Sequence, residues 1–217
     1  MSIESLAQSQ QPGGPHHLLA QLVGHWVGTA RTWFEPDKLA DASPIEGHIR
    51  LVLDGRFALH EYWTSLQGNP IEGIALHGYH LDLDRYETIW IDRFHTGTSM
   101  MFSVGARAET GPAALSVLGQ YPAGNGPPWG WRTAVTVPGP DRLLITHFNI
   151  PPGGEEAKAV EFDYARASAV ATNPASAAPP ASADPPADAA PPASAAPPAS
   201  ADPPASAAPA ATADDAE

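Results

Sequence analysis

The sequence predicts an all-β protein in which about ten antiparallel strands close into an up-and-down barrel. Runs rich in Trp, Tyr, Phe, Ile, Val and Thr recur roughly every 10 to 14 residues between residues 24 and 166, and Gly, Pro and Asp separate them. No helical pattern long enough for a parallel crossover lies between these runs, so neighbouring strands should pair antiparallel. An open ten-stranded sheet would leave two unpaired edges, which favours closure over a two-sheet sandwich, the alternative topology.

A short helix is expected ahead of the first strand. Residues 16–23 follow Pro15 and precede Gly24, and Pro at the start with Gly just beyond the end is the usual asymmetry of a helix. The leucines of this segment and Val23 fall on one face. Residues 1–14, ahead of the helix, are expected to be disordered.

Each expected strand is a run of β-favouring residues bounded by turn residues. Asp54-Gly55, between two apolar runs, is the strongest hairpin signal, and Gly- and Pro-rich segments near residues 69, 111, 139 and 153 separate other runs in the same way. The expected strands are residues 25–34, 45–53, 57–66, 71–81, 86–94, 99–109, 114–121, 131–137, 142–150 and 157–166.

Alternation along the strands indicates which side chains face inward. In residues 45–53 the odd positions are apolar or small, and in residues 71–81 they are Ile, Gly, Ala, His, Tyr and Leu. Many side chains that face the interior are therefore expected to be small or polar, as a ligand cavity or internal water would require. Residues 143–150 are apolar on both faces instead. A partner subunit, as in a homodimer, or the N-terminal helix is expected to cover their outer face.

The end of the chain has a different composition. Residues 175–210 repeat with a period of six, as in Ala-Ser-Ala-Ala-Pro-Pro, and contain no large apolar side chain. Proline removes backbone donors and nothing there can form a core, so residues 167–217 are expected to be an extended, disordered tail. The barrel domain is therefore expected to span residues 15–166.

Charge and cysteine content exclude several classes of function. Up to Arg166 there are 18 acidic and 11 basic residues, a net charge of −7, and the tail adds six acidic residues. Nucleic acid and anionic membranes are therefore not expected as partners. There is no cysteine, which excludes disulfides and thiolate metal sites and fits a cytoplasmic protein. No secretion signal or transmembrane segment is recognised.

The barrel segment resembles a known family. Leu22-Val23-Gly24-His25-Trp26-Val27-Gly28 resembles the Gly-x-Trp opening of the calycin superfamily, whose Trp plugs one end of a lipocalin-like barrel. The rest of the segment resembles a bacterial domain-of-unknown-function family, number 1579, assigned to that superfamily. The matching stretches are residues 28–34, 53–57, 90–97, 129–133, 147–150 and 154–161. The resemblance implies the fold over residues 15–166, and it implies no activity.

Asp92 and His95 are the first candidates for chemistry. An aspartate can orient an imidazole as a general base. Residues three apart on a strand point to opposite faces, so the two side chains meet only if the chain bends near Phe94, and Thr96-Gly97 makes a bend plausible. The alternative is that Asp92 caps the turn while His95 packs at the rim.

Two further groups are candidates for ligand binding. Trp90, Trp131 and Arg132 offer aromatic rings and a guanidinium fork for a carboxylate or phosphate, although Arg132 could equally pair with a glutamate. His147, Asn149 and Glu161 are expected to form a polar cluster inside the barrel, either as a ligand site or as a hydrogen-bond network that sets the register. The nine histidines show no metal-ligand spacing, so neither a metal nor a cofactor is expected.

Three functions remain open. The first is a binding module that holds a small, partly apolar and anionic ligand inside the barrel. The second is a structural or oligomeric barrel with a packed interior. The third is an enzyme in which His95 or His147 is the general base, oriented by Asp92 or Glu161.

Overall fold

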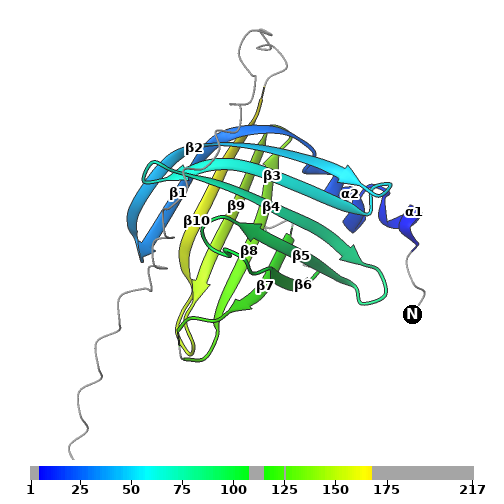
Figure 1. Cartoon of the computed structure of the whole chain (residues 1–217). Helices are drawn as coiled ribbons and strands as arrows, with labels where there is room; N and C mark the ends of the chain where they lie inside the picture. The colour runs from blue at the N-terminus through cyan, green and yellow to red at the C-terminus, as the bar shows by residue number, and fades with distance from the viewer. Residues whose placement is uncertain (1–4, 108–114, 125, 168–217) are drawn as a thin grey trace, which may run out of the picture. The chain divides into compact units, whose positions relative to one another are not determined.

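The computed structural model describes residues 5–107, 115–124 and 126–167, all of which belong to the compact unit Met1–Ala183. These residues form a closed barrel of ten antiparallel strands, and two short helices precede the first strand (Figure 1). The predicted fold class is therefore confirmed. The expectations for residues 1–4 and 168–217 lie outside the described residues.

Each strand pairs with the next along the chain, and β1 pairs with β10 to close the barrel. The strands are β1 (Gly24–Glu35), β2 (Lys38–Val52), β3 (Phe57–Leu66), β4 (Asn69–His80), β5 (Arg85–Asp92), β6 (Met101–Ala106), β7 (Leu115–Tyr121), β8 (Trp129–Gly139), β9 (Arg142–Ile150) and β10 (Ala157–Arg166).

The ten strands occur where the sequence predicts them, and β2 differs most. It begins at Lys38 rather than residue 45, directly after a tight turn in which Asp37 has a φ of 59°. The early part of β2 contains Asp41 and Pro44, which are typical of loops. Pro44 is tolerated because the β2–β3 ladder begins only at Glu46, while the Pro44 carbonyl accepts a hydrogen bond from Thr64 Oγ1.

The N-terminal segment is ordered from Ser5 onward, which corrects the expectation of disorder for residues 5–14. Helix α1 (Leu6–Ser9) begins with a capping box between Ser5 and Gln8, and helix α2 (Pro15–Gln21) has Pro15 in its first turn. The buried Ser9 hydroxyl lies 2.6 Å from His16 Nδ1, which joins the two helices. Short helices of this kind are stabilised by tertiary contacts that sequence patterns do not show.

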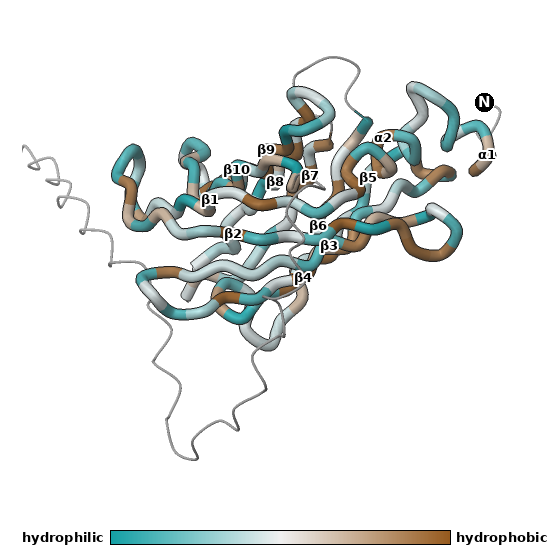
Figure 2. Tube along the Cα trace, turned by 90° about the horizontal axis from the view of Figure 1, so that it is seen from above, coloured by the Kyte–Doolittle hydropathy of each residue, from teal (hydrophilic) through white to brown (hydrophobic). Residues whose placement is uncertain are grey.

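Alternate residues of the strands point into the barrel, and Figure 2 shows hydrophobic and hydrophilic residues interspersed along them. Helix α2 contacts β2, β3 and β4. It does not cover the outer face of β9, contrary to one of the two expectations for residues 143–150. On that face Arg132 lies over the Phe148 ring, 4.1 Å from its centroid.

The two ends of the barrel differ. At the end where β1 begins, Trp26 is fully buried, donates through Nε1 to Leu22 O at 2.9 Å and is covered by the Arg166 guanidinium, as the resemblance implies for the Trp of this motif. The opposite end contains the turn after β5, where the candidate site lies. None of the helices in the part of the chain that the structure describes is long and apolar enough to cross a membrane.

Candidate functional site

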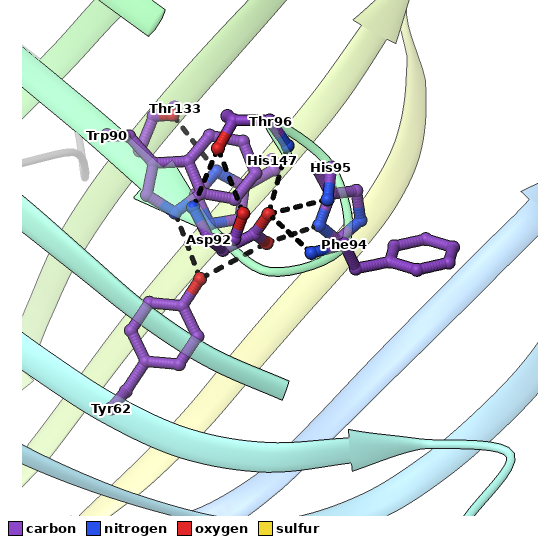
Figure 3. A network of polar contacts seen from close by, with 8 residues as sticks. All are labelled: Tyr62, Trp90, Asp92, Phe94, His95, Thr96, Thr133 and His147. Carbon is purple, nitrogen blue, oxygen red and sulfur yellow. Dashed lines mark hydrogen bonds and ion pairs between the residues drawn. The ribbon is translucent and has the colours of Figure 1, made fainter. Parts of the chain in front are cut away.

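Asp92, the last residue of β5, organises the turn that follows. Its side chain is almost completely buried, and Oδ1 accepts hydrogen bonds from the backbone N–H groups of Phe94, His95 and Thr96 (Figure 3). Thr96 Oγ1 in turn accepts from the Asp92 N–H at 2.7 Å. The chain therefore bends immediately after the strand, as the pairing of Asp92 with His95 requires.

The second carboxylate oxygen of Asp92 holds the His95 ring. Asp92 Oδ2 lies 2.6 Å from His95 Nδ1, which leaves Nε2 of that imidazole for another partner. Burial raises the pKa of Asp92, but the hydrogen bond and charge of His95 and the backbone donors outweigh it and lower the pKa below its ordinary value. Asp92 thus both caps the turn and orients an imidazole, at the distance that acid–base chemistry requires.

A hydrogen-bond chain continues from Asp92 into the barrel. Trp90 Nε1 donates to the Tyr62 hydroxyl at 2.9 Å, and that hydroxyl lies 3.5 Å from Asp92 Oδ2 (Figure 3). Burial and the neighbouring Asp92 charge raise the pKa of Tyr62, so its hydroxyl remains protonated. The rim pair Asp92–His95 is therefore linked to a tryptophan of the interior.

Trp90, Trp131 and His147 form an aromatic stack beside this chain. The Trp90 ring lies parallel to the Trp131 and His147 rings with centroids 5.2 Å away in each case, and the Trp131 and His147 centroids are 5.4 Å apart. His147 Nδ1 lies 3.0 Å from Thr133 Oγ1. Two buried nitrogens of the stack, Trp131 Nε1 and His147 Nε2, have no hydrogen-bond partner within the described residues. Most buried polar atoms in proteins are hydrogen-bonded, so two unpaired neighbouring nitrogens are unusual.

Three buried histidines face the interior of the barrel. His60 Nε2 lies 3.2 Å from the Tyr164 hydroxyl and His77 Nδ1 lies 3.0 Å from Thr88 Oγ1, in the same manner as His147 and Thr133. Burial lowers the pKa of His60 and His147 to about 3 and that of His77 to about 4, and for His60 and His147 two neighbouring imidazoles add to the effect. All three rings are therefore neutral at pH 7.

These histidines line a very small void. Its volume is about 10 Å³, roughly enough for one water molecule. The lining residues are His60, Tyr62, Ala75, His77, Thr88, Trp90, Thr133, Ile145, His147 and Phe162. The sequence leaves a ligand cavity and a packed interior open, and in the structure large aromatic side chains such as Tyr62, Trp90 and Phe162 occupy the lumen.

Arg132 points away from the lumen, contrary to the expectation that it faces an interior ligand. Its guanidinium forms a two-pronged ion pair with Glu156, with contacts of 2.7 and 2.6 Å, on the outer surface. The reason is strand alternation: Trp131 and Thr133 face inward, so the residue between them faces outward. Among the described residues, no Lys or Arg lines the void.

Glu161 also lies outside and does not join His147 and Asn149. Register pairs Val160 with His147, so Val160 and Phe162 face the lumen and Glu161 contacts Arg31 at 3.1 Å and Lys158 at 2.6 Å. A bulge between Lys158 and Val160 sets this register. Asn149 stays near the rim, where its Oδ1 accepts from the Tyr121 hydroxyl at 2.7 Å.

The structure adds members that the sequence analysis did not select, namely Tyr62, His60, His77, Thr88 and Thr133. Alternation offers a signal for some of them, because Ala58, His60 and Tyr62 share one face of β3. Their convergence on one point depends on barrel closure, which a single strand does not show.

Comparison with known proteins places the chain in a family. The family model described as protein of unknown function DUF1579 matches residues 11–166. The chain belongs to the DUF1579 family. Among solved structures, the DUF1579 barrel is similar to an S-type phycobiliprotein lyase, CPES, from Guillardia theta, with 9% identity and a TM-score of 0.45, covering 76% of this chain and 99% of that one. No curated protein matches this DUF1579 member.

Replacing Asp92 by Asn tests the charge at the rim. The amide would keep an acceptor for the turn but lose the charged contact to His95, so Asp92→Asn should lower the free energy of unfolding by about 1–3 kcal/mol at pH 7. Because the folded pKa of Asp92 lies below its unfolded value, its contribution is present above about pH 4 and is lost as the pH falls through the folded pKa. Urea unfolding at pH 7 measures the difference from wild type. Asp82→Asn, at an exposed turn, is the control, and an Asp92→Asn protein as stable as wild type at pH 7 would contradict the assignment.

Proposed function

We propose that this barrel binds a small molecule with an apolar, planar body and a hydrogen-bond acceptor at the Trp90–Trp131–His147 stack. The observation that carries the proposal is the pair of unpaired buried nitrogens, Trp131 Nε1 and His147 Nε2, among the described residues. Leaving a buried polar atom unpaired costs about 1–3 kcal/mol, and an occupant that bonds both nitrogens recovers this free energy.

The chemistry of the stacked residues defines the ligand. Trp131 Nε1 can only donate, whereas the neutral His147 Nε2 donates or accepts according to the tautomer that Thr133 selects. Parallel rings suit a flat apolar or aromatic group. Because no Lys or Arg in the described part of the chain lines the void and Arg132 faces outward, the ligand needs no negative charge. Its polar group is therefore an acceptor such as a carbonyl or amide.

Entry of such a ligand requires side chains to move, because the void holds only about one water molecule. We expect the movement at the rim. There the His95 side chain is 22% exposed and packs against Trp90 and Trp131 at centroid distances of 5.3 and 5.7 Å. Tyr121 lies beside the same Trp131 ring, 6.1 Å away. A ligand that displaces His95 outward would meet the stack directly.

A screen by thermal shift and tryptophan fluorescence tests the proposal. It compares matched pairs such as benzamide with benzoate and a fatty-acid amide with the fatty acid. The neutral member of each pair should bind at least as well as the acid. Trp131→Phe removes the donor and keeps a ring, so it should weaken binding by about 2- to 13-fold, the equivalent of one hydrogen bond, without lowering stability by more than about 1.5 kcal/mol.

Trp63→Phe is the matched control, because Trp63 lies on the outer face of β3 and is 45% exposed. Binding that is equally weakened by Trp63→Phe and Trp131→Phe would contradict the site.

A screen without any stabilising compound would favour a second candidate function, a structural barrel. The packed lumen supports that candidate, as do the outward apolar residues Ile89 and Phe102, which pair across β5 and β6. Light scattering then tests whether these residues form a homodimer. An acid–base role for Asp92 and His95 stays a prediction.

A further inference from the structure

Three metal-ligating side chains meet on the outer surface, remote from the lumen. His25 lies on β1, and Glu46 and His48 lie two residues apart on β2, so both β2 side chains point to the same face. The register of the two strands places His25 directly opposite His48 and Val27 opposite Glu46. The three side chains therefore belong to two cross-strand pairs on one face, with the Trp26–Gly47 pair between them.

The potential ligand atoms already lie close together. His25 Nε2 is 2.8 Å and His48 Nε2 is 3.7 Å from Glu46 Oε1. The two imidazole rings stack with centroids 4.2 Å apart. One ligand atom from each residue falls within 4.8 Å of the other two, and no other group of three His, Asp or Glu residues in the described part of the chain meets this condition.

We propose that His25, Glu46 and His48 bind a divalent transition-metal ion, with Zn²⁺ as the cation that suits them best. Two imidazoles and one carboxylate are a zinc ligand set that leaves a fourth position for water. Zinc–ligand bonds of about 2.0–2.1 Å in a tetrahedron place the ligand atoms about 3.3 Å apart. The contacts of 2.8 and 3.7 Å to Glu46 Oε1 bracket this value, and binding would require the two stacked imidazoles to rotate until both point at the ion.

The surroundings of the three residues favour a cation. Glu61 on β3 lies opposite His48 and adds a second carboxylate near the site, with Arg50 3.6 Å from its Oε2. The Trp63 ring lies beside His48, with centroids 6.2 Å apart. The strands on both sides are hydrogen-bonded, which holds the ligands in place before the ion arrives. A bound ion would join β1 to β2, and its binding would change the fluorescence of Trp63.

Isothermal titration of the untagged full chain with Zn²⁺, and separately with Ni²⁺, tests the site. One ion should bind per chain. His25→Gln and His48→Gln should each weaken binding at least about tenfold. Glu46→Gln should weaken it too. Cu²⁺ should quench part of the tryptophan fluorescence, and Trp63→Phe should remove that part. All these residues are exposed, so circular dichroism should show unchanged folding.

His17→Gln and His80→Gln are the matched controls, because each removes an imidazole that lies outside the cluster. Both should bind Zn²⁺ as wild type does. The proposal is overturned if wild type shows no saturable binding. It is equally overturned if His25→Gln and His48→Gln bind Zn²⁺ as tightly as wild type, since the ion would then lie on other residues.

Discussion

Lowering the pH from 7.5 to 5 should strongly destabilise the barrel, because the interior contains three histidines that stay neutral when folded. Burial lowers the pKa of His60 and His147 to about 3 and that of His77 to about 4, against an ordinary value of 6.5. The unfolded chain therefore takes up protons below pH 6.5 that the folded chain does not accept. Stability is fully present above pH 6.5 and is lost as the pH falls toward the folded pKa values.

The expected effect is large relative to the stability of a typical domain. Each neutral buried histidine changes the free energy of unfolding by about 1.4 kcal/mol per pH unit in this window, so three give about 4 kcal/mol per unit. Between pH 7.5 and 5 the loss is about 6 kcal/mol, whereas whole domains are stable by about 5–15 kcal/mol. Urea unfolding at pH 7.5, 6.5, 5.5 and 5.0 measures the slope directly.

Variants separate these histidines from other titrating groups. His77→Gln should reduce the slope by about one proton, whereas His17→Gln, on helix α2 outside the lumen, should leave it unchanged. If His77→Gln is too unstable to fold, the titration of the histidines can be followed by imidazole NMR signals of the wild type. Signals from three rings should not titrate above pH 5 in the folded protein. A flat stability between pH 6.5 and 5, or titration of all nine histidines near pH 6.5, would contradict the prediction.

Replacing Trp26 by Ala should be the most damaging single truncation at the closed end of the barrel. Trp26 is completely buried, bonds Leu22 O at the end of α2 and packs against Arg166 at the end of β10. The truncation removes a large ring and its hydrogen bond, so we expect a loss of about 3–5 kcal/mol in the free energy of unfolding. Urea unfolding at pH 7.5, where the buried histidines do not contribute to a slope, gives the cleanest value.

Trp63→Ala is the control for Trp26→Ala, because Trp63 is half-exposed on the outer face and its truncation should cost well under half as much. Trp26→Phe keeps part of the ring volume and should fall between wild type and Trp26→Ala. If Trp26→Ala were no more destabilising than Trp63→Ala, then Trp26 would not close this end of the barrel.

Sequence patterns accounted for most of the fold because local chemistry decides where a strand begins and ends. Turn residues such as Asp54-Gly55 separated β2 from β3, and alternation predicted the inward faces of β2 and β4. The Asp92–His95 pair could also be predicted from the sequence, since a bend over three residues depends only on local residues. The early part of β2 was missed because its Pro and Asp favour loops, and pairing with β1 outweighs that preference.

The site was only partly predictable, and the two misplaced residues, Arg132 and Glu161, differ in the reason. Trp131 and Arg132 are neighbours on a strand, so alternation alone assigns them to opposite faces, and the outward position of Arg132 follows from the inward position of Trp131. Glu161 needed more than alternation. Its face depends on the bulge in β10, and a shift of one residue moves every side chain to the other face.

The sequence by itself determined that ten antiparallel strands lie between residues 24 and 166 and that Trp26 lies near the start of the first of them. Only the tertiary structure decided which side chains from different strands come into contact. Closure brings His60, His77 and His147, from β3, β4 and β9, to one void, and cross-strand register places His25 opposite His48. Strand propensity depends on neighbours along the chain, whereas these clusters depend on hydrogen-bond register between segments distant in sequence, which no local pattern specifies.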